Sequence, residues 1–148
     1  MARYDLHHGK SPLEVAIVTG AGAEIVSFTT NEALTAGDWV GLDTTTSGIE
    51  NEERVQNVIQ GNADGKTIGV ALETVASGAT VRVCVSGYVE GALTDGNVAA
   101  AGDTLVAAAS GTVTKGAPSN VLPIIGMALE VDAGSDPYYA DVYIYRRF

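Results

Sequence analysis

The residues best suited to nucleotide chemistry in this sequence lie in a glycine-rich stretch near the N-terminus, VAIVTGAGAEI at 15–25. A dinucleotide-binding turn needs a third glycine, which lets a strand and a helix pack closely, and a helix whose N-terminus faces the pyrophosphate. Two of the glycines are present, but Ile25 stands where the third would be. The residues that follow, VSFTTNEALTAGDW, lack the apolar spacing of a helix. The stretch is therefore predicted to be a hairpin, with strands at 15–19 and 24–28 on either side of a glycine turn.

A second candidate for phosphate binding is the loop GNADGKT at 61–67. A phosphate-binding loop has four residues between its glycines, so that successive backbone N–H groups curl around a phosphate, and a helix follows it. Here three residues separate Gly61 from Gly65, and the strand-like sequence IGVAL follows. Asn-Ala-Asp-Gly is typical of a turn. An enzyme fragment with a nucleotide site at Gly20–Gly22 is kept as an alternative, against which the missing helix argues.

Side chains that could bind a metal or transfer protons are few and poorly spaced. His7 and His8 are adjacent, so on an extended arm they point to opposite sides, and the other good ligand, Cys84, is distant in the sequence. The acidic run at 50–53 lacks the spacing of a calcium loop and is typical of a solvated face. No G-x-S-x-G motif is present, and both histidines lie near the N-terminus. We therefore predict that the protein is not an enzyme and has no catalytic residues, metal or cofactor.

Composition and charge favour a small folded protein and exclude several classes of partner. The chain has 148 residues, of which 46% are hydrophobic, enough for one domain with a core. With 8 basic and 18 acidic residues, its formal charge of −10 excludes the basic surface that nucleic acid or an anionic membrane would require. Cys84 is the only cysteine, so no intrachain disulfide is expected. No apolar run approaches the roughly 18 residues of a membrane span, and synthesis in the cytoplasm is expected.

The elements that must position these residues have the pattern of a small all-β protein. From Leu13 onward, short apolar segments alternate with Gly, Asp, Asn and Ser at intervals of about 8–12 residues. Residues 80–86 and 141–146 alternate in polarity, so their aliphatic side chains are expected on one face of a strand. Residues 1–12 are polar, follow neither period and are predicted to form an extended arm. Residues 49–59 fit a three-turn helix or a strand almost equally well, and both remain open.

An internal repeat is the most informative feature of the sequence. IGVALE at 68–73 recurs as IGMALE at 125–130, and Ala-Gly-Asp at 36–38 recurs at 101–103. From glycine to glycine, the two motifs lie 32 residues apart in the first copy and 24 in the second. The first copy therefore has about eight extra residues, which are placed most simply at 50–64.

The predicted architecture follows from this repeat. Each copy has the order turn, strand, turn, strand, IGxALE element, turn, strand, and the glycine of IGxALE would allow a bend where sheets close on one another. We predict an all-β fold, a small barrel or sandwich built from two degenerate β repeats, with an extended N-terminal arm and at most one short helix. The arm is 1–12 and the single β domain is 13–148, with copies at about 30–87 and 88–148.

Aromatic residues are concentrated at the C-terminus, where five of the nine fall in the last eleven residues. Tyrosine and tryptophan commonly anchor protein interfaces. If Val142 and Ile144 face a core, Tyr143 and Tyr145 form an outward stripe that would contact a partner or a second subunit. Trp39 is a further candidate, although packing in the core or on the sheet would explain these aromatics equally well.

The repeated IGxALE elements, each preceded by Ala-Gly-Asp and followed by a glycine turn and an alternating strand, resemble those of a phage family. The chain is similar to the head-decoration, or capsid cement, proteins of tailed double-stranded DNA phages. IGVALETVASGATVRVCVSGYVEG at 68–91 carries most of the likeness, 87–130 carries the rest, and about 30–148 is covered. The resemblance implies a virion protein that binds the outer surface of the mature capsid, commonly as a trimer, and reinforces the shell against the pressure of packaged DNA. The major capsid protein and further copies of the chain are then its expected partners.

Contacts with the capsid are expected at the two ends of the chain. Half of the basic residues lie there, at Arg3, Lys10, Arg146 and Arg147. An extended arm such as 2–9 can add as a strand to an exposed sheet edge. The candidate residues for contact with the capsid or with another subunit are Arg3, Tyr4, Leu6, Trp39, Tyr143, Tyr145, Arg146, Arg147 and Phe148.

A hypothesis from another class is a small carbohydrate- or ligand-binding β-module of a phage fibre or adhesin. An exposed Trp39 and exposed tyrosines would then stack on a sugar. A trimer in light scattering would favour the capsid protein, whereas a monomer that binds saturably on a glycan array would favour the β-module.

Overall fold

Ten β-strands and one short helix make up the described part of the chain, residues 22–48, 50–117 and 121–145 of a computed structural model. In chain order, the strands are β1 (Glu24–Thr30), β2 (Trp39–Leu42), β3 (Asn57–Gln60), β4 (Thr67–Ala71), β5 (Thr80–Thr94), β6 (Thr104–Ala107), β7 (Val113–Lys115), β8 (Ile124–Ala128), β9 (Ala133–Gly134) and β10 (Tyr138–Ile144). The helix, α1 (Asn51–Arg54), lies between β2 and β3. The prediction of an all-β fold with at most one short helix is confirmed for these residues.

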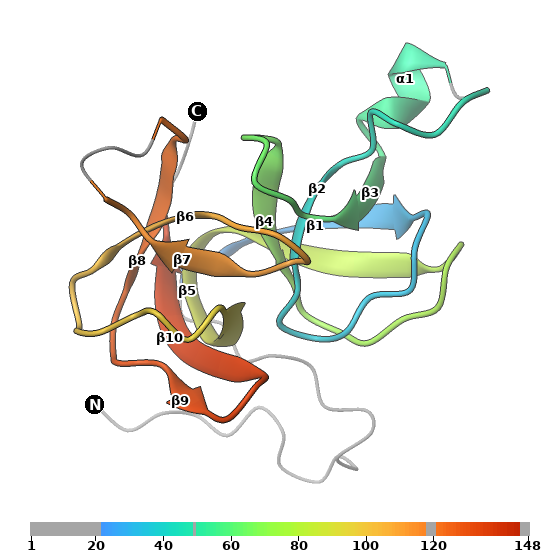
Figure 1. The fold of residues 1–148 in the computed structure, drawn as a ribbon. Coiled ribbons are helices and arrows are strands. Elements are labelled where there is room, and N and C mark those ends of the chain that lie inside the picture. The colour runs from blue at the N-terminus through green and yellow to red at the C-terminus, as the bar shows by residue number, and fades with distance from the viewer. Residues whose placement is uncertain (1–21, 49, 118–120, 146–148) are drawn as a thin grey trace, which may run out of the picture.

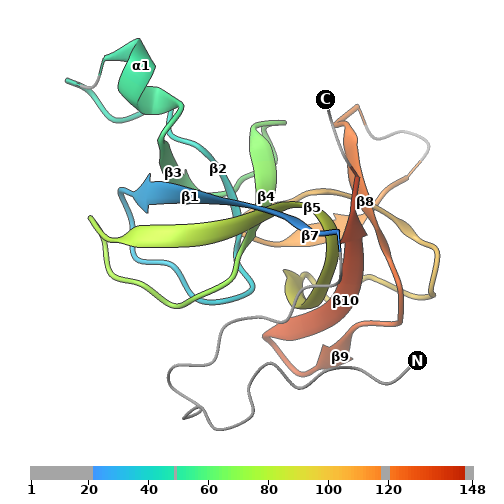
Figure 2. The same cartoon turned by 180° about the vertical axis from the view of Figure 1, so that it is seen from behind.

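The strands close into two rings that share β5. The first ring runs β1, β3, β2, β4, β5 and returns to β1, and the second runs β5, β7, β6, β8, β10 and returns to β5, with β9 beside β10. Neighbouring strands are antiparallel except for β1–β3 and β5–β7. Figures 1 and 2 show the rings side by side, with β5 running from one into the other. We call the first ring barrel 1 and the second barrel 2.

The pairing in barrel 2 repeats the pairing in barrel 1 strand for strand. β2, β3, β4 and the N-terminal half of β5 correspond to β6, β7, β8 and β10, and β1 corresponds to the C-terminal half of β5. The registers correspond as well, since Val70 pairs with Cys84 in barrel 1 and Met127 pairs with Tyr143 in barrel 2. The repeat in the sequence is therefore a repeat of a five-stranded unit.

The glutamate of each IGxALE element has the same contact in both barrels. Glu73 Oε1 accepts a hydrogen bond from the backbone N–H of Arg82 (3.1 Å), and Glu130 Oε1 accepts one from the backbone N–H of Asp141 (2.9 Å). Each carboxylate thereby ties the turn after its element to the strand that follows. This shared contact gives a physical reason for the repeated glutamate.

The glycine of each IGxALE element lies where a neighbouring backbone comes closest. A Cβ atom on Gly69 would lie 2.2 Å from the carbonyl oxygen of Cys84, and one on Gly126 would lie 2.5 Å from that of Tyr143. The facing strands, β2 and β6, each have a shift in register opposite these glycines. Only glycine leaves room for this approach, which brings adjacent strands of a narrow barrel together.

β5 can serve both barrels because it bends. Gly87 and Gly91 have φ angles of +99° and +75°, which glycine adopts at little cost. The alternation predicted for 80–86 is present, with Val83 buried inside barrel 1. Cys84, on the opposite face, is buried as well because that face packs in the core shared with barrel 2. Both faces of this half of β5 therefore contribute to cores.

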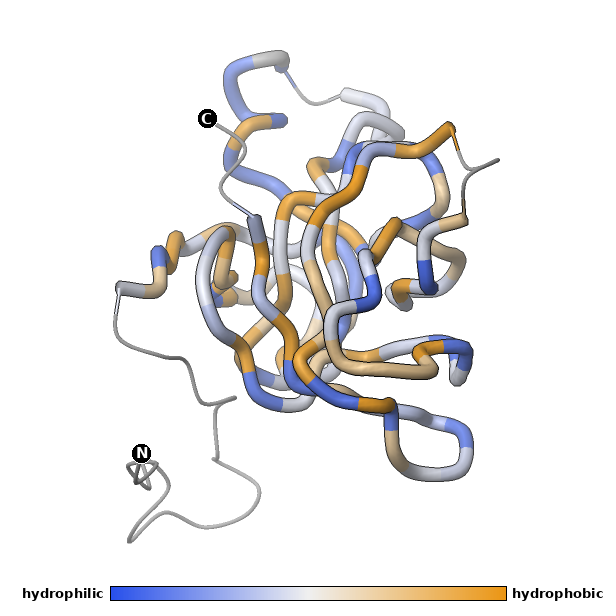
Figure 3. The backbone as a smooth tube through the Cα atoms, turned by 90° about the vertical axis from the view of Figure 1, so that its left-hand side faces the viewer, coloured by the Kyte–Doolittle hydropathy of each residue, from blue (hydrophilic) through white to orange (hydrophobic). Residues whose placement is uncertain are grey.

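Two clusters of buried side chains form the interior. The cluster inside barrel 1 consists of Leu34, Val40, Val58, Ala71, Val81 and Val83. The other fills barrel 2 and continues into the junction between the barrels, and it consists of Trp39, Val70, Leu72, Cys84, Val89, Ala92, Val98, Leu105, Ala107, Val113, Ile125, Ala128, Val142 and Ile144. Hydrophobic and hydrophilic residues are interspersed along the backbone (Figure 3), and they alternate in parts of β5 and β10.

Residues 49–59, for which the sequence predicted either a helix or a strand, contain both, because α1 is followed by β3. Residues 43–56 join β2 to β3, whereas residues 108–112 suffice to join β6 to β7. The extra residues of the first copy therefore begin earlier than the predicted 50–64. α1 projects beyond both barrels in the two opposite views (Figures 1 and 2).

Candidate interaction surface

Six of the nine residues proposed for contact lie outside the described residues: Arg3, Tyr4, Leu6, Arg146, Arg147 and Phe148. His7, His8 and the first strand of the predicted hairpin, 15–19, also lie outside them. The second strand of that hairpin is β1, which pairs with β5 and β3. The structure therefore describes three of the candidates, Trp39, Tyr143 and Tyr145.

Trp39 is fully buried where the two barrels meet. Its indole Nε1–H donates a hydrogen bond to the carbonyl oxygen of Leu93 on β5 (3.0 Å), and its backbone N–H donates one to Gly111 before β7 (2.9 Å). One residue thus ties together segments that are distant in the sequence. Trp39 belongs to the junction between the barrels, and this placement removes it from the surface that another protein could contact.

Tyr143 and Tyr145 lie on the opposite face of the β10 segment from the core. Val142 and Ile144 are buried, whereas 46% of Tyr143 is exposed and Tyr145 is half-buried. The centroids of the two tyrosine rings are 6.4 Å apart. This pair is the aromatic part of a larger exposed surface.

Met127, Leu129 and Thr104 complete that surface. Met127 pairs with Tyr143 on one side and with Thr104 on the other, and 39% of Leu129 is exposed at the end of β8. Sequence analysis did not propose these three residues, although the alternation within IGMALE places Met127 and Leu129 on one face. We call Thr104, Met127, Leu129, Tyr143 and Tyr145 together the tyrosine face.

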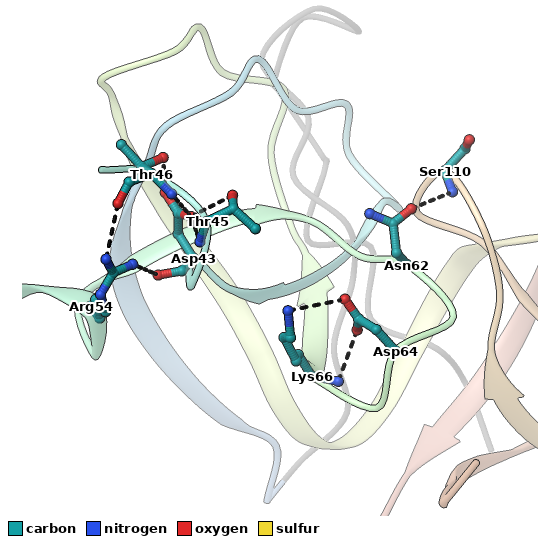
Figure 4. Close-up of polar contacts among 8 residues, drawn as sticks. All are labelled: Asp43, Thr45, Thr46, Arg54, Asn62, Asp64, Lys66 and Ser110. Atoms are coloured by element: carbon teal, nitrogen blue, oxygen red, sulfur yellow. Dashed lines mark hydrogen bonds and ion pairs between the residues drawn. The ribbon is translucent and has the colours of Figure 1, made fainter. Parts of the chain in front are cut away.

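A hydrogen-bond network around Asp43 fixes the start of the inserted segment 43–56 (Figure 4). Asp43 has no exposed surface, and its carboxylate accepts hydrogen bonds from the backbone N–H groups of Thr45 (2.9 Å) and Thr46 (3.0 Å) and from the Asn31 amide (2.6 Å). The Arg54 guanidinium donates to the carbonyl oxygens of Asp43 (3.1 Å) and Thr46 (3.0 Å). The end of α1 is thereby fastened to the turn that follows β2.

The same network sets the charge state of Asp43. Burial alone would raise the pKa of its carboxyl, but the hydrogen bonds from Thr46, Asn31 and Thr45 outweigh burial and hold the pKa well below its usual range. A carboxylate whose pKa is lower in the folded state adds stability above the unfolded value of about 4. That stability is lost as the pH falls from there toward the folded pKa.

Replacement of Asp43 by asparagine is expected to lower the free energy of unfolding by about 2 kcal/mol at neutral pH, because an amide nitrogen would face groups that donate. The unfolding free energy of Asp43→Asn should also fall less steeply below about pH 4 than that of the wild type. Urea denaturation at neutral and acidic pH measures both effects. Glu52→Gln, at an exposed position on α1, is the matched control and should change stability by less than about 0.5 kcal/mol. An equally steep acid loss in Asp43→Asn would contradict the assignment.

The loop at 61–67 is a turn closed by its own side chains (Figure 4). Asp64 accepts a hydrogen bond from the backbone N–H of Lys66 (3.0 Å), and its other carboxylate oxygen lies 3.5 Å from Lys66 Nζ. Asn62 Oδ1 accepts a hydrogen bond from the backbone N–H of Ser110, in the loop between β6 and β7 (3.4 Å). β4 follows the loop, so the interpretation as a turn that leads into a strand is confirmed.

Across the described ranges, no group of three or more His, Cys, Asp or Glu residues is placed to hold a metal ion. In that same part of the chain, no helix has the length and apolar character to cross a membrane. Burial raises the pKa of the Cys84 thiol to about 11, so its nucleophilic thiolate is a minor form at neutral pH.

Comparisons with known proteins agree with this fold. The family described as phage cement protein matches residues 19–142, a span that includes strands of both barrels. The N base of head fiber gp8.5 of bacteriophage phi29 has a similar crystal structure, with a TM-score of 0.56 over 83% of this chain and 94% of that chain. The two sequences are 15% identical, so this likeness concerns the fold alone. No curated protein matches the chain.

Proposed function

The chain belongs to the phage cement protein family, and from this premise we propose that it binds the outer surface of the mature phage head as a homotrimer. It is a structural protein of the phage virion. Its proposed role is to stabilise the shell against the outward pressure of packaged DNA, and its proposed partner is the major capsid protein. The observation that carries the proposal is the family match at 19–142, because it extends through both barrels.

A trimer suits this role for a physical reason. A domain of 15.1 kDa offers one capsid subunit a modest contact area, so a single contact would be weak. Three linked copies make the second and third contacts at high effective concentration. An oligomer that bridges neighbouring capsid subunits would thus bind tightly and resist their separation.

The placement of the basic residues supports contact through the ends of the chain. The four cationic side chains in the described ranges all have partners within the chain: Arg54 on backbone carbonyls, Lys66 on Asp64, Arg82 on Glu73 and Lys115 on Asp103. The other four, Arg3, Lys10, Arg146 and Arg147, lie outside the described residues, near the two termini. The termini are therefore the proposed contacts with an acidic capsid surface.

The carbohydrate-binding alternative loses Trp39, one of the aromatic residues on which it rests. Stacking on a sugar ring requires an exposed aromatic face, and Trp39 has none. Tyr143 is exposed, but no observation favours a sugar over a protein partner there, and we propose no second function.

Deletion of Met1–Lys10 is expected to abolish binding to mature capsids, because the arm would add as a strand to the capsid and two cations would be lost with it. Co-sedimentation with expanded and unexpanded capsids is the measurement. Wild-type protein should pellet with expanded capsids only and should raise the temperature at which they break open.

The circular dichroism spectrum and light scattering of the deletion variant serve as its controls and should match those of the wild type. Undiminished co-sedimentation of the variant would exclude the arm as the contact. Absence of wild-type protein from both pellets would contradict the proposed function itself.

A further inference from the structure

The tyrosine face has a counterpart in barrel 1, because the repeated strand pairing gives each position in one barrel an equivalent in the other. The registers of β2, β4 and β5 match those of β6, β8 and β10. The equivalent positions, with barrel 1 first, are Trp39 and Thr104, Val70 and Met127, Leu72 and Leu129, Cys84 and Tyr143, and Ser86 and Tyr145.

The two equivalent faces differ in what covers them. In barrel 1, Trp39, Val70 and Cys84 are 0% exposed, because this face packs in the cluster that continues into barrel 2. In barrel 2, by contrast, Leu129 is 39% exposed and Tyr143 is 46% exposed. One face of the repeated unit is therefore covered by a barrel in the first half of the chain and open in the second half.

The part of barrel 2 that packs around Trp39 also has an equivalent in barrel 1, and this equivalent is partly exposed. Within the chain, barrel 2 contributes Val89 and Ala92 of β5 to the cluster around Trp39, and both are fully buried. Their equivalents in barrel 1, by the registers of β1 and β5, are Val26 and Phe28. Val26 is 39% exposed and Phe28 is half-buried against the cluster of barrel 1, and both lie on the same face of β1.

We propose that the tyrosine face of one copy docks on the β1 surface at Val26 and Phe28 of a second copy. The contact between chains would reproduce the junction that joins the two barrels within a chain. The proposal rests on the homo-oligomer of the proposed function and identifies the two surfaces that form it. Because these surfaces differ, the interface is heterologous and can close into a ring, as a trimer requires.

The chemistry of the two surfaces fits this contact. None of the five residues of the tyrosine face is charged, and interface cores are poor in charge and rich in tyrosine and methionine. Val26 and Phe28 supply apolar surface for the tyrosine rings to cover. Burial of such apolar area drives association in proportion to the area removed from water.

Disruption of the tyrosine face should dissociate the oligomer without unfolding the chain. Tyr143→Lys, at an exposed position, is expected to raise the dissociation constant of the oligomer about tenfold to a hundredfold. The measurement is light scattering or sedimentation over a concentration series. Val55→Lys, which introduces the same side chain at another exposed apolar residue, is the control and should leave the oligomer intact. Near-wild-type urea denaturation of both variants would exclude a folding defect.

Disulfide trapping identifies the two surfaces directly. Val26→Cys and Tyr143→Cys, made as separate variants, should each stay uncrosslinked alone and give an intermolecular disulfide when mixed under mild oxidation. The native thiol is buried at Cys84 and should not interfere. A crosslink in Tyr143→Cys alone would mean that the face pairs with itself, and absence of a crosslink in the mixture, free or on capsids, would also overturn the proposal.

These outcomes separate the interface from the proposed function. An oligomer that survives Tyr143→Lys overturns the proposed interface, whether or not capsid binding persists. If the surviving oligomer has lost co-sedimentation with mature capsids, the tyrosine face contacts the capsid instead. A wild-type chain that is monomeric both free and on the capsid overturns the interface, while co-sedimentation would still uphold capsid binding.

Discussion

Replacement of Gly69 by alanine is expected to lower the free energy of unfolding by about 3 kcal/mol or more, because the added methyl group has nowhere to go. Its Cβ would lie 2.2 Å from the carbonyl oxygen of Cys84, and a backbone atom cannot swing aside as a side chain does. Relief would require β4 to move away from β5, on which both cores depend. Urea denaturation followed by circular dichroism measures the loss.

Gly48→Ala provides the matched control for Gly69→Ala. Gly48 has a φ of +80°, but no atom lies within 4 Å of the Cβ that would be added. Its replacement should therefore cost only the backbone strain of about 1 kcal/mol. Equal losses in the two variants would show that close approach is not what requires glycine at Gly69.

Replacement of Trp39 by alanine is expected to cost about 4 kcal/mol, the loss typical of a large aromatic side chain removed from a core. The cavity would open between the barrels, and the carbonyl oxygen of Leu93 would lose the indole N–H that donates to it. Trp39→Phe keeps most of the packing and removes the donor, so a loss of about 1 to 2 kcal/mol is expected. Urea denaturation should be followed by circular dichroism, because Trp39 is the one tryptophan of the chain and its variants have no tryptophan fluorescence to monitor.

The pair of tryptophan variants also tests where Trp39 acts. If Trp39 lay on the outer surface, Trp39→Ala would change stability by less than about 0.5 kcal/mol. Such a result would contradict its placement at the junction and would restore it as a contact residue.

The repeat in the sequence predicts more of this fold than the pattern of any single strand. IGxALE and Ala-Gly-Asp mark equivalent positions, which the strand pairing confirms. Alternation also places Val142 and Ile144 in a core and Tyr143 outside it. These features are local, so the order of residue types is enough to predict them.

What the sequence could not predict depends on contacts between the barrels. Trp39 and Thr104 occupy equivalent positions, yet Trp39 is buried because barrel 2 covers it. Cys84 is buried for the same reason, although it shares its face of β5 with the polar residues Arg82 and Ser86. The insertion 43–56 was misplaced by several residues because a count between motifs gives its size and not its start.

For the proposed role on a pressurised shell, the strand shared by the two barrels has a mechanical consequence. Two barrels connected by a flexible linker could each unfold and refold while the other stayed folded. Here the N-terminal half of β5 pairs with β1 in barrel 1 and its C-terminal half pairs with β10 in barrel 2, so a pull on one barrel reaches the other along one hydrogen-bonded strand. Under load, the two barrels should therefore behave as one rigid body and not as two independent domains.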